Sequence, residues 1–268
     1  MIAKIPRRII QTDKSRDLPL LAKAATVNLR LLNPDFEYLF FDDAEVESFI
    51  DTEFPQYRSV FDSLTPRIQR YDLFRYLAVY RYGGFYFDTD VLLASSLDGL
   101  LEFGCVFPFE QLGVYSFLHE EYGMDWEIGN YAFGASAGHP FLGAVIENCI
   151  RAHKYPRWVE PMIKSIPRMF RDEYLVLATT GPGLLSRTLA TCPGACDQVK
   201  VLFSDNVCDP ARWFRFGDYG VHLQVGTWRT RQALVPRVLH RLWEQSKRDA
   251  LMKESLRRGP KRAIEFKR

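Results

Sequence analysis

Apolar and polar residues alternate along the chain in a pattern that predicts a layered α/β domain. β-Prone runs at 7–12 and 36–41 flank a segment at 18–32 whose apolar residues recur at helical spacing, and Asn33-Pro34 ends that segment. The remaining pattern predicts strands at 85–87, 104–109 and 199–203, helices at 66–82, 140–152, 184–189 and less clearly 158–170, a loop-rich insertion at 112–125, and irregular chain from 204 to 228. Strands that alternate with helices indicate a sheet covered by helices.

The segment from 66 to 90 carries the strongest chemical signal. Its helical pattern ends at Gly83-Gly84, and a buried, aromatic strand then delivers Asp88 and Asp90. In an extended chain these two carboxylates project to the same side, about 6 to 7 Å apart. Carboxylate oxygens suit Mn²⁺ or Mg²⁺, and an ion held by two of them keeps positions free for substrate phosphates. The alternative is a strand that ends in a solvated acidic turn.

The helix before this strand places Asp72, Arg75 and Tyr76 on one face, at positions i, i+3 and i+4. Such an Asp/Arg pair is ordinarily a solvated salt bridge. Here the chain passes directly from the helix into the D-x-D strand, so the pair is expected close to the metal. There Asp72 could accept sugar hydroxyls and Arg75 could neutralise phosphate charge.

Length and composition predict one domain at 1–236, followed by a basic helix or tail at 237–268. The 268 residues are 47% hydrophobic, and no linker or repeat divides them. Beyond Arg237 the chain carries ten Lys and Arg residues, with an apolar stripe formed by Val238, Leu242, Leu251 and Leu256. Either the tail binds an anionic membrane surface or it is a solvated helix.

Net charge, hydropathy and cysteine content limit the classes of partner and the cellular locations that we expect. A net charge of only +2 argues against a nucleic-acid partner. No window approaches the roughly 18 uninterrupted apolar residues of a membrane span, so we expect a cytoplasmic protein, either free or peripheral to the membrane, or a catalytic domain presented without its anchor. The five cysteines favour free thiols in a reducing compartment, with a Cys192–Cys196 disulfide as the alternative.

The block from Pro66 to Asp90, with Tyr-Gly-Gly-Phe-Tyr-Phe-Asp-Thr-Asp at its end, resembles the sugar-binding D-x-D region of glycosyltransferase family 32. That family includes fungal mannosyltransferases and α-1,4-galactosyltransferases and is related to the glucosylating domain of large clostridial toxins. Further blocks that follow the family's order lie at 5–12, 33–38, 129–134, 138–141, 180–182 and 222–228.

The resemblance implies a GT-A-like nucleotide-diphospho-sugar transferase fold with a single mixed, mostly parallel sheet. It also implies a metal-dependent, retaining transfer of a hexose from a UDP- or GDP-sugar to a hydroxyl of a glycan or glycolipid, in polysaccharide, lipopolysaccharide or glycolipid synthesis. The residues that it marks are Asp72, Arg75 and Tyr86 as catalytic, Gln11, Asp88, Asn130, Gly181 and Trp228 as donor-binding, and Asp88, Asp90 and His222 as ligands of Mn²⁺ or Mg²⁺. A loop histidine such as His222 is otherwise seldom a metal ligand.

One departure from the family leaves the donor base open. The chain has Ile10 where the family often has histidine, and Asp13 where an aromatic residue is common.

Three other functions are weighed against the transferase. An effector-like enzyme would share the donor site and modify a protein. An inactive sugar-binding module would be expected to have lost part of the acidic and basic set, which is intact. A phosphatase or nuclease would need further clustered carboxylates and histidines.

Overall fold

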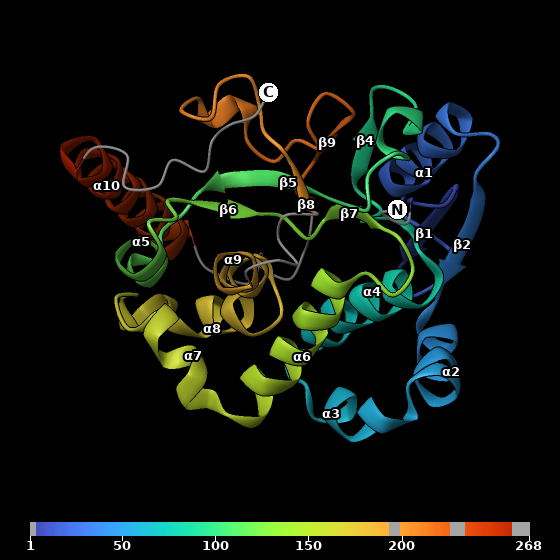
Figure 1. Cartoon of the computed structure of the whole chain (residues 1–268), viewed down its shortest axis with the longest axis horizontal. Helices are drawn as coiled ribbons and strands as arrows, with labels where there is room; N and C mark the ends of the chain where they lie inside the picture. The colour runs from blue at the N-terminus through green and yellow to red at the C-terminus, as the bar shows by residue number, and fades with distance from the viewer. Residues whose placement is uncertain (1–3, 193–198, 226–233, 259–268) are drawn as a thin grey trace.

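The computed structural model describes residues 4–192, 199–225 and 234–258 and shows a central β-sheet with helices on both faces (Figure 1). The strands are β1 (Arg8–Thr12), β2 (Glu37–Phe41), β3 (Gly84–Phe87), β4 (Val91–Leu93), β5 (Cys105–Leu112), β6 (Trp126–Ile128), β7 (Ala132–Ala135), β8 (Val199–Leu202) and β9 (Gly220–His222). The helices are α1 (Leu20–Leu32), α2 (Asp43–Glu53), α3 (Arg58–Ser63), α4 (Ile68–Tyr82), α5 (Ser116–Tyr122), α6 (Pro140–Lys154), α7 (Pro156–Ile163), α8 (Arg171–Thr179), α9 (Pro182–Thr191) and α10 (Leu234–Arg258).

The main sheet has the strand order β2-β1-β3-β7-β5-β6, and β8 pairs with β5. In the described chain, β1 pairs in parallel with β2 and β3, and β5 with β8, whereas β3–β7, β5–β7 and β5–β6 are antiparallel. The predicted α/β class and the mixed sheet flanked by helices are confirmed. As predicted, most of the sheet's described strands run in one direction: β1, β2, β3, β5 and β8 are parallel to one another, and β6 and β7 run the opposite way. A second sheet, β4–β9, lies beside it.

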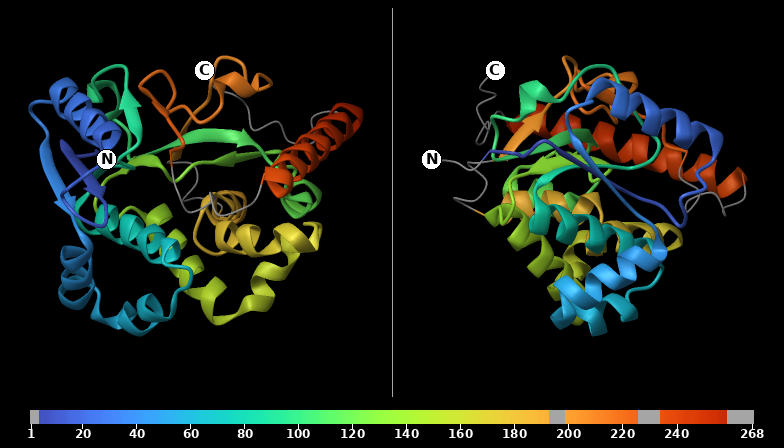
Figure 2. Two further views of the ribbon diagram at one scale, coloured as in Figure 1. Left: turned by 180° about the vertical axis from the view of Figure 1, so that it is seen from behind. Right: turned by 90° about the vertical axis from the view of Figure 1, so that its right-hand side faces the viewer.

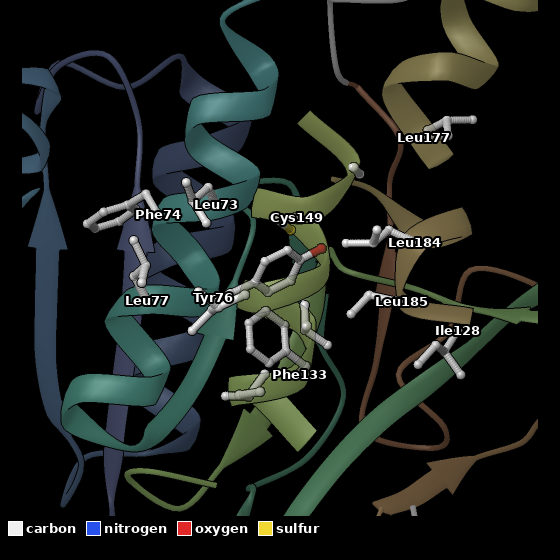
Figure 3. Close-up of a cluster of buried hydrophobic side chains, with 14 of the residues drawn as sticks. Leu73, Phe74, Tyr76, Leu77, Ile128, Phe133, Cys149, Leu177, Leu184 and Leu185 are labelled. Carbon is white, nitrogen blue, oxygen red and sulfur yellow. The ribbon is translucent and has the colours of Figure 1, made fainter. Parts of the chain in front are cut away.

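The alternation of side chains along β3 divides the core into two clusters. Tyr86 points into the cluster under α4, α6 and α9, whereas Phe85 and Phe87 point into the cluster under α1 and β4. Figure 3 shows part of the first cluster, where Tyr76 and Phe133 meet the leucines of α9. Because β3 is buried on both faces, it reads in the sequence as a continuous aromatic run rather than as an alternating one.

Gly83 and Gly84 connect α4 to β3 where no other residue fits. Their φ angles are +66° and +111°, in the region that L side chains rarely adopt. A Cβ on Gly84 would also lie 2.6 Å from the carbonyl oxygen of Arg8 on β1. The glycine pair therefore lets β3 enter the sheet directly against β1.

The layer opposite α4 consists of α1 and the small β4–β9 sheet (Figures 1 and 2). Asn28 of α1 fixes the two parts to each other, since its side-chain oxygen accepts a hydrogen bond of 2.8 Å from the backbone N–H of Leu93 on β4. None of the helices in the described chain is long and apolar enough to cross a membrane.

The C-terminal helix α10 packs against earlier parts of the chain rather than standing free. Trp243 contacts Phe170 and Tyr174, with ring centroids 5.6 and 5.5 Å away, and the guanidinium of Arg248 donates to the carbonyl oxygen of Leu112 at 3.0 Å. The expected apolar stripe is divided, because Val238 and Leu242 are exposed whereas Leu251 is buried. Residues 259–268 lie outside the described chain, and the boundary at 236 stays a prediction.

Several short elements differ from the sequence prediction. The expected loop at 112–125 contains α5, and the expected irregular chain at 204–228 contains β9. The pattern also did not indicate α8 or β7. Each of these elements is short and is held by tertiary contacts, so the local sequence carries little signal for it.

Candidate functional site

The D-x-D motif is a turn between two strands. β3 ends at Phe87, the backbone N–H of Asp88 donates to the carbonyl oxygen of Tyr131 at 2.7 Å, and the N–H of Val91 turns back to the carbonyl oxygen of Asp88 at 3.2 Å. The expectation of an extended Asp88-Thr89-Asp90 is therefore wrong. The tight turn brings the two carboxylates closer together than an extended chain would.

His222 reaches the same turn from the other end of the chain. β9 pairs with β4 so that His222 lies opposite Val91, and the N–H of Leu223 donates to the carbonyl oxygen of Asp90 at 2.9 Å. The His222 ring lies 3.2 Å from Asp90, measured from Nε2 to Oδ1. The His222 ring also stacks on the ring of Tyr131, with ring centroids 4.4 Å apart and planes inclined by 18°. The structure thus brings together all three predicted metal ligands.

The three side chains fit a divalent cation. One atom from each of Asp88, Asp90 and His222 lies within 4.8 Å of the others. Two ligands on opposite sides of a Mg²⁺ ion at 2.0–2.1 Å would be about 4.2 Å apart, so small side-chain rotations suffice. Nδ1 of His222 is buried and has no hydrogen-bond partner among the described residues. Two carboxylates and an imidazole suit Mn²⁺ or Mg²⁺ with positions left for substrate oxygens.

The two carboxylates differ in their electrostatics. Burial raises the pKa of Asp88, and the Arg75 guanidinium only partly offsets this. For Asp90 burial acts in the same sense, but the His222 contact and the N–H of Val225, which donates to Oδ2 at 2.9 Å, outweigh it and lower the pKa. Asp90 is therefore the carboxylate held in its charged form without a cation, and a bound cation would favour the charged form of Asp88.

Arg75 links the turn to a buried polar network. Its guanidinium donates to the carbonyl oxygen of Asn130 at 2.8 Å and forms ion pairs with Asp88 at 3.3 Å and with Asp72 at 3.4 Å. The predicted Asp72/Arg75 pair therefore lies beside the metal ligands, and it is not a solvated salt bridge, because the two side chains are only 7% and 5% exposed. Burial alone would lower the pKa of Arg75, but Asp88, Tyr86 and Asp72 outweigh it and raise the pKa.

Asp72 is occupied on both oxygens. Oδ1 accepts from the amide of Asn130 at 2.9 Å and Oδ2 from the hydroxyl of Thr180 at 2.8 Å. The Asn130 amide also donates to the Tyr76 hydroxyl at 3.1 Å, and that hydroxyl donates to the carbonyl oxygen of Thr180 at 2.7 Å. Asp72 thus holds the loop after β6 and the start of α9 together. Its predicted contact with a sugar hydroxyl stays a prediction.

Tyr86 and Gln11 support the turn from the sheet. The Tyr86 hydroxyl donates to Oδ1 of Asp88 at 2.8 Å, and the Arg75 guanidinium lies 4.8 Å from the centre of its ring. The Gln11 amide is fully buried, and its oxygen accepts from Thr26 and Tyr38 at 3.1 and 2.9 Å. In this arrangement Gln11 holds β1 and β2 beside the site, and its predicted contact with the donor is untested.

Two further predictions have different outcomes. Gly181 is buried and caps α9 next to Thr180, so the structure places it behind the Asp72 network. Trp228 lies outside the described residues.

Sequence reasoning missed the roles of Thr180, Tyr76 and Tyr131. Tyr76 shares a helix face with Asp72, and this spacing was the available signal; nothing in the local sequence marks the stacking of Tyr131 on His222.

Comparisons with known proteins show what the chain is similar to. Residues 21–107 match the family described as glycosyltransferase sugar-binding region containing DXD motif. Inositol phosphoceramide mannosyltransferase 3 of Schizosaccharomyces pombe is 34% identical over 150 residues, covering 56% of this chain and 38% of that protein. Mannosyl phosphorylinositol ceramide synthase SUR1 of Saccharomyces cerevisiae is 29% identical over 182 residues, covering 68% of this chain and 41% of that protein. Among solved structures, PaToxG glycosyltransferase has a TM-score of 0.49 and 14% identity, with 69% of each chain covered.

The matched relatives are longer than the matched region, since the chain covers less than half the length of either of these two. The family match spans α1 through the D-x-D turn and into β5, which includes the Asp72/Arg75 pair and two of the three metal-ligand candidates. Residues 21–107 are therefore similar to a glycosyltransferase sugar-binding region that contains a D-x-D motif, which agrees with the family that the sequence resembles, and the first of these relatives is named a mannosyltransferase.

Proposed function

We propose that this chain transfers a hexose, with mannose as the first candidate, from a UDP- or GDP-sugar to a hydroxyl of a glycolipid, with a divalent cation held by Asp88, Asp90 and His222. The observation that carries the proposal is the convergence of two carboxylates and one imidazole beside the buried Arg75. The names of the relatives, which are mannosyltransferases acting on inositol phosphoceramide, support mannose and a lipid acceptor.

The described residues divide the work of such a transfer. The cation, as Mn²⁺ or Mg²⁺, would supply Lewis-acid stabilisation of the departing diphosphate. Arg75 holds Asp88 in place and adds a positive charge on the same side. Tyr86 fixes the Asp88 carboxylate through its hydroxyl, and Asp72 fixes Asn130 at the rim of the network.

We propose retention of the anomeric configuration. The bond from the anomeric carbon to the diphosphate oxygen breaks, and the bond to the acceptor oxygen forms on the same face. The acceptor proton passes to the departing diphosphate. This front-side displacement needs no carboxylate nucleophile, and it suits a site in which both oxygens of Asp72 are already occupied.

The setting of the enzyme is also a proposal. The basic helix α10 and the chain after it provide one candidate for contact with an anionic membrane, and a cytoplasmic location stays a prediction. A protein acceptor would use the same donor site as a glycolipid acceptor. The candidate metal ligands therefore do not distinguish the two acceptor classes, and an assay with acceptors of both classes does.

The test is donor hydrolysis by the purified chain with Mn²⁺ and a panel of UDP- and GDP-sugars. We expect slow hydrolysis of one donor, loss of that hydrolysis in EDTA, and recovery with added Mn²⁺ or Mg²⁺. Donor binding without hydrolysis would indicate a sugar-binding module, and full activity in EDTA would overturn the metal role. Adding inositol-phosphate glycolipids or acceptor proteins then separates the acceptor classes.

A further inference from the structure

The outer face of α1 is apolar although it faces solvent. Leu20, Val27 and Leu31 are 85%, 55% and 74% exposed. Their spacing of seven and eleven residues places them on one line along the helix, and the exposed Ala24 lies on the same line. The opposite face of the helix carries the buried residues Ala22, Ala25 and Leu29. A surface helix normally presents polar residues on its outer side, so α1 departs from the expected pattern.

The charged residues within α1 are all cations, although Lys23 forms an ion pair of 2.8 Å with the exposed Asp17 just before the helix. Lys23 and Arg30 lie along one side of the apolar stripe formed by Leu20, Ala24, Val27 and Leu31, and the helix contains no Asp or Glu. Residues 4–38 carry seven Lys and Arg against four Asp and Glu. An apolar stripe flanked by cations is typical of helices that lie in the interface of an anionic membrane.

A pocket adjoins the stripe and extends its apolar surface inward. It has a volume of about 550 Å³ and lies between α1 and the first two strands; its lining residues are Ile9, Val27, Arg30, Leu31, Asn33, Pro34, Phe36 and Tyr38. Val27 and Leu31 belong to both the stripe and the pocket. Arg30 lies over the Tyr38 ring, 4.9 Å from its centre, and places a positive charge at the same pocket. Hydrocarbon inside and an anionic group beside Arg30 would match this lining.

α1 lies in the same layer as β4 and β9, the two strands next to the candidate metal ligands. α1 is fixed to β4 through Asn28, and β4 follows Asp90 and pairs with β9, which carries His222. Leu92 on β4 and Leu223 and Val225 after β9 are 39%, 36% and 50% exposed. Exposed apolar side chains therefore lie on β4 and directly after β9, close in sequence to Asp90 and His222.

We propose that the apolar stripe of α1 and its adjoining pocket dock the protein on an anionic membrane, with the stripe at the boundary between headgroups and acyl chains. A second copy of the chain is a poorer occupant, because a two-fold contact through this face would set the cations of one copy against those of the other. The docking itself does not depend on the proposed transfer; only its use, to present a lipid acceptor at the site, rests on the proposed function.

Vesicle sedimentation of the full chain tests the docking. Vesicles of phosphatidylcholine with 30% phosphatidylserine should bind the parent protein at least tenfold more strongly than pure phosphatidylcholine. The double variant Leu20→Gln/Leu31→Gln should lose at least tenfold in binding, and Lys23→Gln/Arg30→Gln should lose most of the preference for the anionic vesicles. Both leucines are exposed, so the double variant should fold, which a melting curve checks.

Matched variants on other surfaces complete the design. Met169→Gln, at a 59% exposed position just before α8, should bind vesicles like the parent. Leu242→Gln, at a 62% exposed position on α10, should also leave binding unchanged. Loss of binding in Leu242→Gln but not in the α1 variant would assign the contact to α10 and overturn the proposal.

Two further readouts separate the alternatives. If the α1 variant changes a dimer into a monomer in light scattering while vesicle binding stays at the parent level, the stripe is a contact between copies and the proposal fails. Donor hydrolysis in solution is measured for every variant and should stay at the parent level. A parent that binds vesicles but hydrolyses no donor would count against the proposed function alone, whereas a parent that ignores anionic vesicles would overturn the docking alone.

Discussion

Replacing Arg75 by lysine should damage both the fold and the site while preserving the charge. The guanidinium contacts Asp72, Asp88 and the carbonyl oxygen of Asn130 at once. An ammonium group is a point charge and cannot span these three directions. We therefore expect Arg75→Lys to lose at least one of the contacts, each of which is a hydrogen bond or ion pair with a charged group.

The magnitude follows from the burial of the network. A hydrogen bond to a charged group stabilises a protein by about 1.5–3 kcal/mol. For a chain of this size that loss lowers the melting temperature by roughly 3–12 °C, at about 2–4 °C per kcal/mol. Because Asp88 loses a partner that positions it, kcat/KM for donor hydrolysis should fall at least about tenfold, which is about 1.4 kcal/mol in the barrier.

Two other variants are compared with Arg75→Lys by calorimetry and in the hydrolysis assay, one as a control and one as a more severe change. Arg81→Lys, at an exposed ion pair with Glu53 near the end of the same helix, should match the parent in both measurements. Arg75→Met should be worse than Arg75→Lys, because it leaves the buried carboxylate of Asp72 and the partly buried carboxylate of Asp88 without their cation, a loss of about 3–5 kcal/mol. If Arg75→Lys melts and hydrolyses like the parent, the guanidinium does not organise the site and the reasoning is refuted.

Three further changes test other parts of the structure. Asp90→Asn should abolish Mn²⁺-dependent donor binding in titration calorimetry while the protein still melts in one cooperative transition, since Asp90 lies at a turn and not in the core; retained binding would remove it from the metal site. Burial raises the pKa of Asp72, so the folded state binds the proton of the Asp72 carboxyl more tightly than the unfolded state does. The contribution of Asp72 to stability therefore falls as the pH rises above about 4, the pKa of an unfolded aspartate. The free energy of unfolding of the parent relative to Asp72→Asn should therefore increase as the pH is lowered from 7 towards 4 in urea titrations, and a flat difference over this whole range would contradict the assigned cause. Gly84→Ala should lower stability by about 1–3 kcal/mol through its φ of +111°, before the clash with Arg8 is counted, whereas Gly143→Ala inside α6 should be neutral or stabilising by up to about 1 kcal/mol.

The part of the site that could be predicted lies within one local segment. The helix that carries Asp72 and Arg75, the glycine stop and the aromatic strand follow each other directly, and each has a strong local pattern. Helical periodicity alone places Asp72 and Arg75 on one face. That they are buried against Asn130 and Thr180 depends on α9 and the loop after β6, which lie far away in the sequence.

The parts that could not be predicted depend on pairing at a distance. β9 has three residues, and its position is set by β4 rather than by its own composition. The turn at Asp88 to Asp90 is held by the carbonyl oxygen of Tyr131, which no pattern near the motif reveals. For α1 the sequence predicts a helix, but its two apolar faces leave open which one is buried until the sheet is in place.

The pairing of β9 with β4 also orders the assembly of the site in time. A chain is synthesised from its N-terminus, so Asp88 and Asp90 leave the ribosome long before His222 does. A nascent chain that ends before β9 carries α4, β3 and the two carboxylates, but it lacks the imidazole and the strand that braces the turn. Such a fragment would meet cellular cations with an incomplete ligand set. The candidate cation site is thus complete only in a chain that extends past β9, and products that end before His222 lack one of its three ligands.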